Sequence, residues 1–207
     1  MTTPLPAGVS ANTEAAQKFK TEMGFQQPQP GVTGPLYPYC KNPGVVHCPG
    51  DKRYQLKVGT GYSGPYSWDS FSGGYYLNGE GQTATAKILK KRTNITRPSD
   101  KFVWAEGADM RGENTGGWSM IDGSAVNNFN DAKFVDSPAA FHITSADFNF
   151  ADGHAEGHKW LDGTTIAFAN DTSQSKDAGG PTQTAANNHV NVDAIWCASR
   201  QAQKQNP

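Results

Sequence analysis

The residues whose types could do chemistry gather in one stretch of the sequence, residues 141–160. Histidines, carboxylates and an amide recur there at close spacing: His142, Asp147, Asn149, Asp152, His154, Glu156 and His158. Histidine and glutamate side chains act as general acids and bases, and a base beside a group that neutralises a carboxylate supports β-elimination at a uronic acid. An enzyme of this kind would be a polysaccharide lyase. Its candidate catalytic residues are His142, His154, Glu156 and His158.

Other reaction chemistries have no signature in the chain. It contains no nucleophile elbow, paired-carboxylate motif or phosphate-binding loop. Cys48 lies in a Pro/Gly-rich loop rather than before a helix, so nothing marks it as an activated nucleophile. His154 and His158 would be about 13 Å apart on a strand, at ~3.3 Å per residue, which is too far to share an ion. A zinc site built from these two histidines alone is therefore disfavoured.

Two short strands joined by Asp152-Gly153 are the elements that must position these residues. Asp-Gly between alternating runs is typical of a two-residue hairpin turn, because glycine tolerates the positive φ that the turn requires. With these two as the turn, Asp147 lies opposite His158 and Asn149 opposite Glu156. Phe148 and Phe150 then define a buried face. The opposite face is predicted to carry Asp147, Asn149, His154, Glu156, His158 and, if the alternation continues, Trp160.

The remaining elements are fewer and shorter. Residues 11–25 are the best helix candidate, and residues 101–106 read as a strand from their aromatic and β-branched content. Residues 191–196 form a short final strand or helical turn. We expect one domain over residues 1–207, with frayed ends at 1–10 and 201–207 and a surface loop at 170–188. The aromatic residues of the 54–81 segment either cover a core or form a carbohydrate-binding surface: Tyr62, Tyr66, Trp68, Tyr75 and Tyr76.

Composition excludes some partners. The net charge is -1, so no bulk field draws the chain to nucleic acid or anionic lipid. No apolar run approaches the roughly 18–20 residues of a membrane span. The cysteines, Cys40, Cys48 and Cys197, allow at most one intramolecular disulfide. Cys40 and Cys48 are close enough in sequence to close a loop in an oxidising compartment, and three free thiols are the alternative.

Several short segments resemble, in order, a bacterial family of prepilin-type, type II secretion pseudopilin-like proteins. His142, followed by nine residues and Asp152-Gly153, resembles the family's C-terminal signature. The segment 47–51, His-Cys-Pro-Gly-Asp, resembles its Cys-Pro-x-Asp element. Weaker likenesses lie at residues 75–78, 95–106 and 193–196. The resemblance runs from about residue 35 to residue 196.

The resemblance implies an α+β, pilin-like fold in which an N-terminal helix packs on an antiparallel β-sheet with long loops. It also implies that His142, Asp152 and Gly153 are structural residues that fix the hairpin. Related pseudopilins bind calcium through oxygen-rich loops. Asp147, Asn149 and Asp152 offer hard ligands for Ca²⁺ here, although no EF-hand spacing is present.

The start of the chain departs from the family. Family members begin with a basic leader, a peptidase site and a long hydrophobic helix, and none of these is present in this sequence. We therefore expect the soluble, extracytoplasmic part of a periplasmic or cell-surface protein, without membrane contact in this form. Its anchoring helix would have been removed, or the chain is a natural stand-alone descendant. The expected function is a pseudopilin-like subunit whose full-length form joins other pseudopilin or pilin subunits. The alternative is a polysaccharide lyase or glycan-binding module.

Overall fold

The computed structural model describes only part of the chain, and the account below is confined to that part. The described residues are 7–8, 15–16, 18–19, 37–56, 68–77, 88–108, 118, 120–121, 129–130, 132–172 and 190–203.

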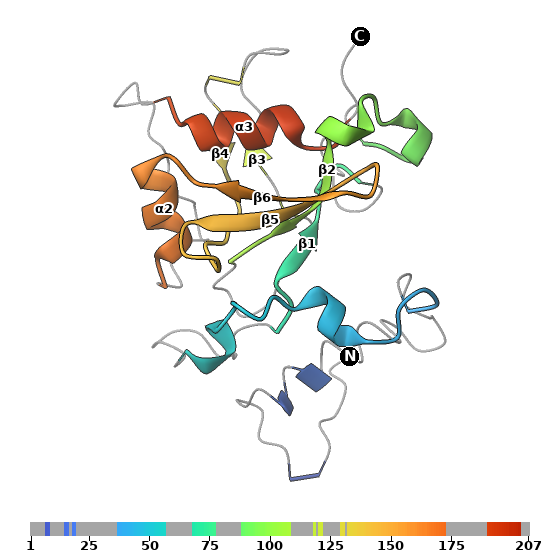
Figure 1. Ribbon diagram of the computed structural model, residues 1–207, viewed down its shortest axis with the longest axis vertical. Helices are drawn as coiled ribbons and strands as arrows, with labels where there is room; N and C mark the ends of the chain where they lie inside the picture. The colour runs from blue at the N-terminus through green and yellow to red at the C-terminus, as the bar shows by residue number, and fades with distance from the viewer. Residues whose placement is uncertain are drawn as a thin grey trace.

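The centre of the molecule is an open antiparallel sheet of four strands in the order β1-β2-β5-β6 (Figure 1). The strands are β1 (Phe71–Gly73), β2 (Phe102–Glu106), β5 (Ser145–Phe150) and β6 (Ala155–Lys159). The shorter strands β3 (Met120–Ile121) and β4 (Lys133–Phe134) form a separate antiparallel pair. β2 agrees with the strand predicted at residues 101–106. Its pairing with β5 is irregular between Phe102 and Trp104.

Two α-helices accompany the sheet: α2 (Gly163–Asn170) and α3 (Val192–Arg200). Asp162 caps α2 by accepting from Thr164 N–H, and Asn191 caps α3 by accepting from Ala194 N–H, so each helix starts where a side chain satisfies its first free donors. The single-turn 3-10 helices are η1 (Pro43–Val46), η2 (Arg53–Gln55), η4 (Arg92–Asn94) and η5 (Pro98–Asp100). The α+β class expected from the sequence is confirmed.

The core lies between the main sheet and α3, which runs above β5 and β6 in Figure 1. Phe148 is fully buried at its centre and meets Trp196 of α3 with 5.1 Å between ring centroids. Phe102, Trp118 and Trp160 also contact the Phe148 ring. Edge-to-face and tilted contacts of this kind add to the stabilisation from burial alone.

The β5–β6 hairpin forms where it was predicted, but its loop is longer by one residue. Phe150 N–H donates to His154 O at 2.9 Å, and Gly153 N–H donates to Phe150 O at 3.0 Å. The loop therefore consists of Ala151, Asp152 and Gly153. A three-residue hairpin loop needs a positive φ at its last position, and Gly153 has φ +105°.

The longer loop shifts the hairpin register by one residue. In β5, Phe148 and Phe150 are buried as predicted, with Asp147 and Asn149 on the other face. The prediction for the second strand was wrong. Glu156 was predicted to lie opposite Asn149, but it lies opposite Phe148. Side chains alternate with a period of two, so a one-residue slip moves a whole strand's set to the other face. The phenylalanine face accordingly carries His154, Glu156 and His158.

The predicted N-terminal helix at residues 11–25 lies mostly outside the described residues. Ala15, Ala16, Lys18 and Phe19 are helical, and Lys18 Nζ lies 5.6 Å from the ring centroid of Trp68. A helix packed on the sheet is not shown by the described part of the chain. The loop predicted at 170–188 and the frayed end predicted at 1–10 are also largely outside it. Of the frayed end predicted at 201–207, residues 201–203 are described, and Gln201 and Ala202 are fully buried.

The aromatic segment and the possibility of a membrane span were the remaining expectations from the sequence. Trp68 and Tyr76 are buried, which favours the core interpretation for these members of the aromatic segment, whereas Tyr62 and Tyr66 lie outside the described residues. None of the helices in the described part of the chain has the length and apolar character needed to cross a membrane.

Candidate functional site

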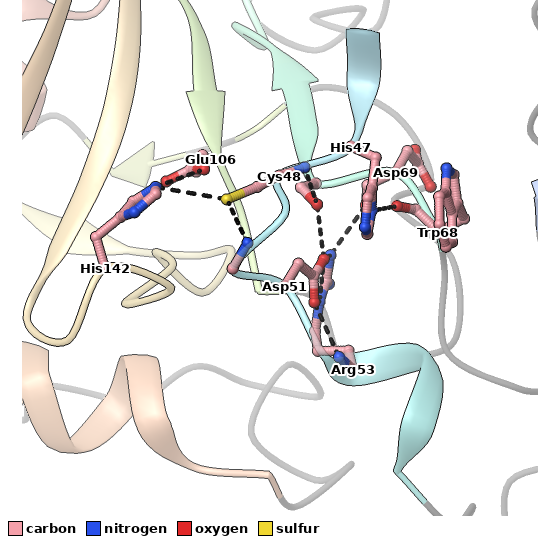
Figure 2. A network of polar contacts seen from close by, with 10 residues as sticks. His47, Cys48, Asp51, Arg53, Trp68, Asp69, Glu106 and His142 are labelled. Carbon is pink, nitrogen blue, oxygen red and sulfur yellow. Dashed lines mark hydrogen bonds and ion pairs between the residues drawn. The ribbon is translucent and has the colours of Figure 1, made fainter. Parts of the chain in front are cut away.

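Three segments far apart in the sequence meet at the end of the sheet where β2 ends and β5 begins (Figure 2). Cys48 follows η1, Glu106 is the last residue of β2, and His142 lies just before β5. One ligand atom from each residue, Cys48 Sγ, a Glu106 carboxylate oxygen and a His142 ring nitrogen, lies within 4.8 Å of the other two. We call these residues the Cys48–Glu106–His142 cluster.

A single ring nitrogen is the centre of this cluster. His142 Nε2 lies 3.4 Å from Cys48 Sγ and 3.4 Å from Glu106 Oε1. The same nitrogen also lies 3.4 Å from Oδ2 of Asp147, which is the third residue of β5. Cys48 and Glu106 are buried, whereas the side chains of His142 and Asp147 are 42% and 47% exposed. The cluster is therefore buried on the side of Cys48 and Glu106 and open to solvent on the side of His142 and Asp147.

The Cys-Pro-x-Asp element holds Cys48 in place through a buried polar network (Figure 2). Cys48 N–H donates to Ser70 Oγ at 3.0 Å, and the Ser70 hydroxyl donates to Asp51 Oδ2 at 2.7 Å. Arg53 neutralises the fully buried Asp51, with Nη2 2.7 Å from Oδ2. Removing one partner of such a buried pair would leave an uncompensated charge, so the network fixes the cysteine loop against the start of β1.

A close backbone approach brings the cysteine loop against the histidine loop. A Cβ atom on Gly50 would lie 2.8 Å from the carbonyl oxygen of Phe141, the residue before His142. Glycine is therefore required at this position by space. The approach couples the positions of Cys48 and His142, which are separated by 94 residues.

His142 is held by a strained turn. Thr144 N–H donates to His142 O at 3.0 Å, and the intervening Ile143 has φ +72°. These are the features of a γ-turn with positive φ, which is rare for a β-branched residue and costs about 1–3 kcal/mol. Ile143 is also 88% exposed, so burial of its side chain does not offset this cost. Strain of this kind persists where the surrounding structure imposes it.

The buried members of the cluster disfavour their ionised forms. Burial raises the pKa of the Cys48 thiol to about 12, and the neighbouring Glu106 adds to the shift. Burial also raises the pKa of Glu106, and contacts with Cys48, the Asp147 N–H and His142 only partly offset this. Asp147 N–H donates to Glu106 Oε2 at 2.8 Å, but Glu106 Oε1 has no hydrogen bond of good geometry. A positive charge inside the cluster would therefore stabilise the ionised forms of both Cys48 and Glu106.

The arrangement differs from a cysteine–histidine–carboxylate catalytic triad. In a triad the imidazole contacts the nucleophile through one nitrogen and the carboxylate through the other, so that a proton can pass through the ring. Here Cys48 and Glu106 both approach His142 Nε2. The high pKa of Cys48 also opposes thiolate formation at neutral pH. One donor atom from each of the three residues lies within 4.8 Å of the other two, which is close enough for a single ion to contact all three.

The candidate catalytic residues of the hairpin lie apart from His142 and are held by local contacts. His154 stacks on Phe150 with 4.3 Å between ring centroids, and its Nδ1 lies 2.6 Å from Asp152 Oδ1. His158 stacks on Trp196 of α3 at 3.8 Å and its Nε2 lies 3.4 Å from Asp193 Oδ1. These contacts orient the rings for packing.

The remaining residues predicted for a site lie either near His142 or near His154. Glu156 Oε2 lies 4.0 Å from His154 Nε2, and its side chain is 51% exposed. Asp147, one of the three proposed calcium ligands, turns toward His142, whereas Asp152 bonds to His154 in the loop. Asn149 shares the Asp147 face of β5.

Sequence reasoning about reactive residues did not identify Cys48 and Glu106 as members of a site. Cys48 was considered only as a nucleophile or a disulfide partner, and Cys40, Cys48 and Cys197 are all free thiols. Glu106 ends a strand and has no motif of its own. The available signal was the ordered resemblance, because the segments that carry Cys48, Glu106 and His142 all belong to it.

No family model, curated protein or solved structure matches the chain.

Proposed function

We propose that the chain is an extracytoplasmic, pseudopilin-like subunit that takes part in type II secretion or in a type IV pilus-like assembly. In this role it would bind other pseudopilin or pilin subunits and would have no turnover of its own. A pilin-like arrangement, with an N-terminal helix against the sheet, is part of the same proposal.

The observation that carries the proposal is the convergence of the resembling segments. The Cys-Pro-x-Asp element, the end of β2 and the histidine of the C-terminal signature are separated by tens of residues in sequence. Their side chains nevertheless form the Cys48–Glu106–His142 cluster, with ligand atoms within 4.8 Å of one another. Segments that matched by chance would have no reason to meet in space. Their meeting supports a shared tertiary structure behind the resemblance.

The contacts of the hairpin histidines favour a structural role over a catalytic one. A general base needs a ring nitrogen within reach of a substrate proton. One nitrogen of His154 is engaged by Asp152, and His158 is packed between Trp196 and Asp193 with 13% of its side chain exposed. We expect His154→Ala and His158→Ala to change folding stability and to abolish no enzymatic activity.

Assembly is the direct test of the proposed function. Antibodies against the chain should detect the parent protein in the cell-envelope fraction of its source organism. Crosslinking in intact cells, followed by mass spectrometry of the captured bands, should identify pilin-type subunits as neighbours. Recovery of the protein from the cytosolic fraction without such neighbours would contradict the proposal.

A second candidate function is action on, or binding of, an anionic polysaccharide. A hollow of about 540 Å³ beside the hairpin loop is lined by Lys90, Lys91 and Arg92, by Asp152, and by apolar residues that include Leu77, Leu89 and Phe150. Consecutive basic residues around a hollow suit a uronate or sulfate group. Alginate, hyaluronan, chondroitin sulfate and heparin should be tested for unsaturated products by ultraviolet absorbance. We expect none, and a product lost in a His142→Ala, His154→Ala or Glu156→Ala variant that still folds would establish the lyase instead.

A further inference from the structure

We propose that Cys48, Glu106 and His142 bind one divalent transition metal ion of the zinc type. Metal binding at these residues does not depend on whether the protein joins a pilus-like assembly.

The donor types select the class of ion. Cysteine sulfur, histidine nitrogen and a carboxylate oxygen together are the ligands of Zn²⁺ and its close relatives in proteins. Ca²⁺ and Mg²⁺ prefer oxygen ligands alone, so a buried cysteine and a histidine in the set disfavour them. When the ion binds, the thiol proton of Cys48 and any proton on the Glu106 carboxyl are released to solvent as the metal–sulfur and metal–oxygen bonds form.

The two distances from His142 Nε2 are close to those between donor atoms around a tetrahedral ion. Metal–ligand bonds of about 2.0–2.3 Å at tetrahedral angles place nitrogen about 3.3 Å from oxygen and about 3.6 Å from sulfur. His142 Nε2 lies 3.4 Å from Glu106 Oε1 and 3.4 Å from Cys48 Sγ. An ion can therefore enter the cluster with small adjustments of the side chains.

A second, independent observation points to a cation. Glu106 is fully buried, and its Oε1 atom has no hydrogen bond of good geometry, because its contact with His142 Nε2 is 3.4 Å long. Buried polar atoms are almost always satisfied by a hydrogen bond, a water molecule or an ion. The neighbouring Asp51 shows the usual solution, because Arg53 neutralises it at 2.7 Å. A bound metal ion would satisfy Glu106 in the same way.

Three protein ligands leave one tetrahedral position for water or a small ligand. His142 is the exposed member of the cluster, so this position lies on the solvent side, where Asp147 Oδ2 lies 3.4 Å from Nε2. Asp147 is not a member of the group whose donor atoms all lie within 4.8 Å. We therefore assign it an outer role, in which it hydrogen-bonds to the water on the metal.

Cobalt titration tests the site directly, because Co²⁺ reports its ligands through its absorption spectrum. The chain, purified without a polyhistidine tag and kept reduced, should bind one Co²⁺. The spectrum should show a sulfur-to-metal charge-transfer band and the intense visible bands of tetrahedral coordination. Added Zn²⁺ should bleach both bands by displacing the cobalt.

Matched variants locate the ion. Cys48→Ser should remove the charge-transfer band, and His142→Ala should weaken Co²⁺ binding by at least about 100-fold. The controls are Cys40→Ser and His154→Ala, which remove a thiol and a partly exposed imidazole elsewhere and should leave the titration unchanged. Glu106→Gln should also weaken binding. If that buried change prevents folding, the partly exposed His142 decides the matter.

Two results would overturn the proposal. One is the absence of saturable Co²⁺ and Zn²⁺ binding to the folded, reduced chain at micromolar concentrations. The other is binding that survives unchanged in Cys48→Ser or His142→Ala, or that is lost in Cys40→Ser. In the second case the metal lies at another place on the surface.

Discussion

At the scale of single residues, the cluster depends on neighbours that have no part in its chemistry. Gly50 leaves room for the backbone of Phe141, and Ile143 accepts a positive φ so that His142 can turn toward Cys48. The buried ion pair between Asp51 and Arg53 holds the loop that carries Cys48. Each of these residues positions a donor atom, so substitutions there should disturb the site without removing a ligand.

Gly50→Ala tests the close approach of the two loops. The new methyl group would meet the Phe141 carbonyl oxygen at 2.8 Å, so the backbone must shift, and we expect a loss of about 1–3 kcal/mol in the free energy of unfolding. Urea unfolding followed by circular dichroism measures the change. Gly163→Ala is the control, since its Cβ has open space at the start of α2, and it should be neutral or slightly stabilising. Equal stability of the Gly50→Ala variant and the wild type would refute the packing argument.

At the scale of elements, one carboxylate joins α3 to the end of the hairpin. Asp193 in the first turn of α3 is almost fully buried and accepts the backbone N–H groups of Leu161 and Asp162, which lead into α2. Burial alone would raise the Asp193 pKa, but the hydrogen bonds from His158, Asp162 and Leu161 outweigh it, so the pKa lies below its ordinary value. The ionised form therefore stabilises the folded state.

This pKa shift predicts a pH-dependent effect of Asp193→Asn. A depressed folded-state pKa contributes stability above the unfolded value of about 3.9, and the contribution is lost as the pH falls through the folded value. The variant should be less stable by about 2 kcal/mol at pH 7, and the difference should shrink below about pH 4. Urea unfolding across this pH range measures it. Asp100→Asn is the control, because Asp100 is exposed and lies 3.7 Å from Arg97, and it should change stability little at any pH.

At the scale of the whole molecule, the cluster ties three distant parts of the chain to the same end of the sheet. A ligand that binds only the folded state stabilises it by mass action, by about 2.7 kcal/mol at a concentration of 100 Kd. Zn²⁺ should therefore raise the melting temperature of the wild type, and a chelator should reverse the rise. Cys48→Ser should abolish the effect, and Cys40→Ser should retain it.

Calcium is the informative comparison in the same experiment. We expect Ca²⁺ to leave the melting temperature unchanged, because the cluster contains sulfur and nitrogen donors. A rise with Ca²⁺ that persists in Cys48→Ser would instead indicate a calcium site outside the cluster. Asp147 and Asp152, expected from the sequence to share such an ion with Asn149, lie apart, beside His142 and beside His154 respectively. A rise with neither ion would count against the metal cluster.

Local patterns in the sequence are sufficient to predict part of the fold. Alternation of apolar residues around Asp152-Gly153 was enough to predict the hairpin and the burial of Phe148 and Phe150. Aromatic and β-branched residues were enough to predict β2. These outcomes follow from neighbours a few residues apart, whose preferences do not need the rest of the fold. α2 was missed, because its apolar residues form no regular stripe and its start depends on the Asp162 cap.

The hairpin register and the Cys48–Glu106–His142 cluster depend on long-range contacts that the sequence does not reveal. Because Ala151 belongs to the loop, His154, Glu156 and His158 lie on the phenylalanine face of the hairpin. No local preference distinguishes a two-residue loop from a three-residue loop that ends in the same glycine. The meeting of Cys48 with His142 spans 94 residues and depends on how the sheet brings β2 beside β5. Local sequence cannot specify such a contact, because strand pairing sets which distant side chains become neighbours.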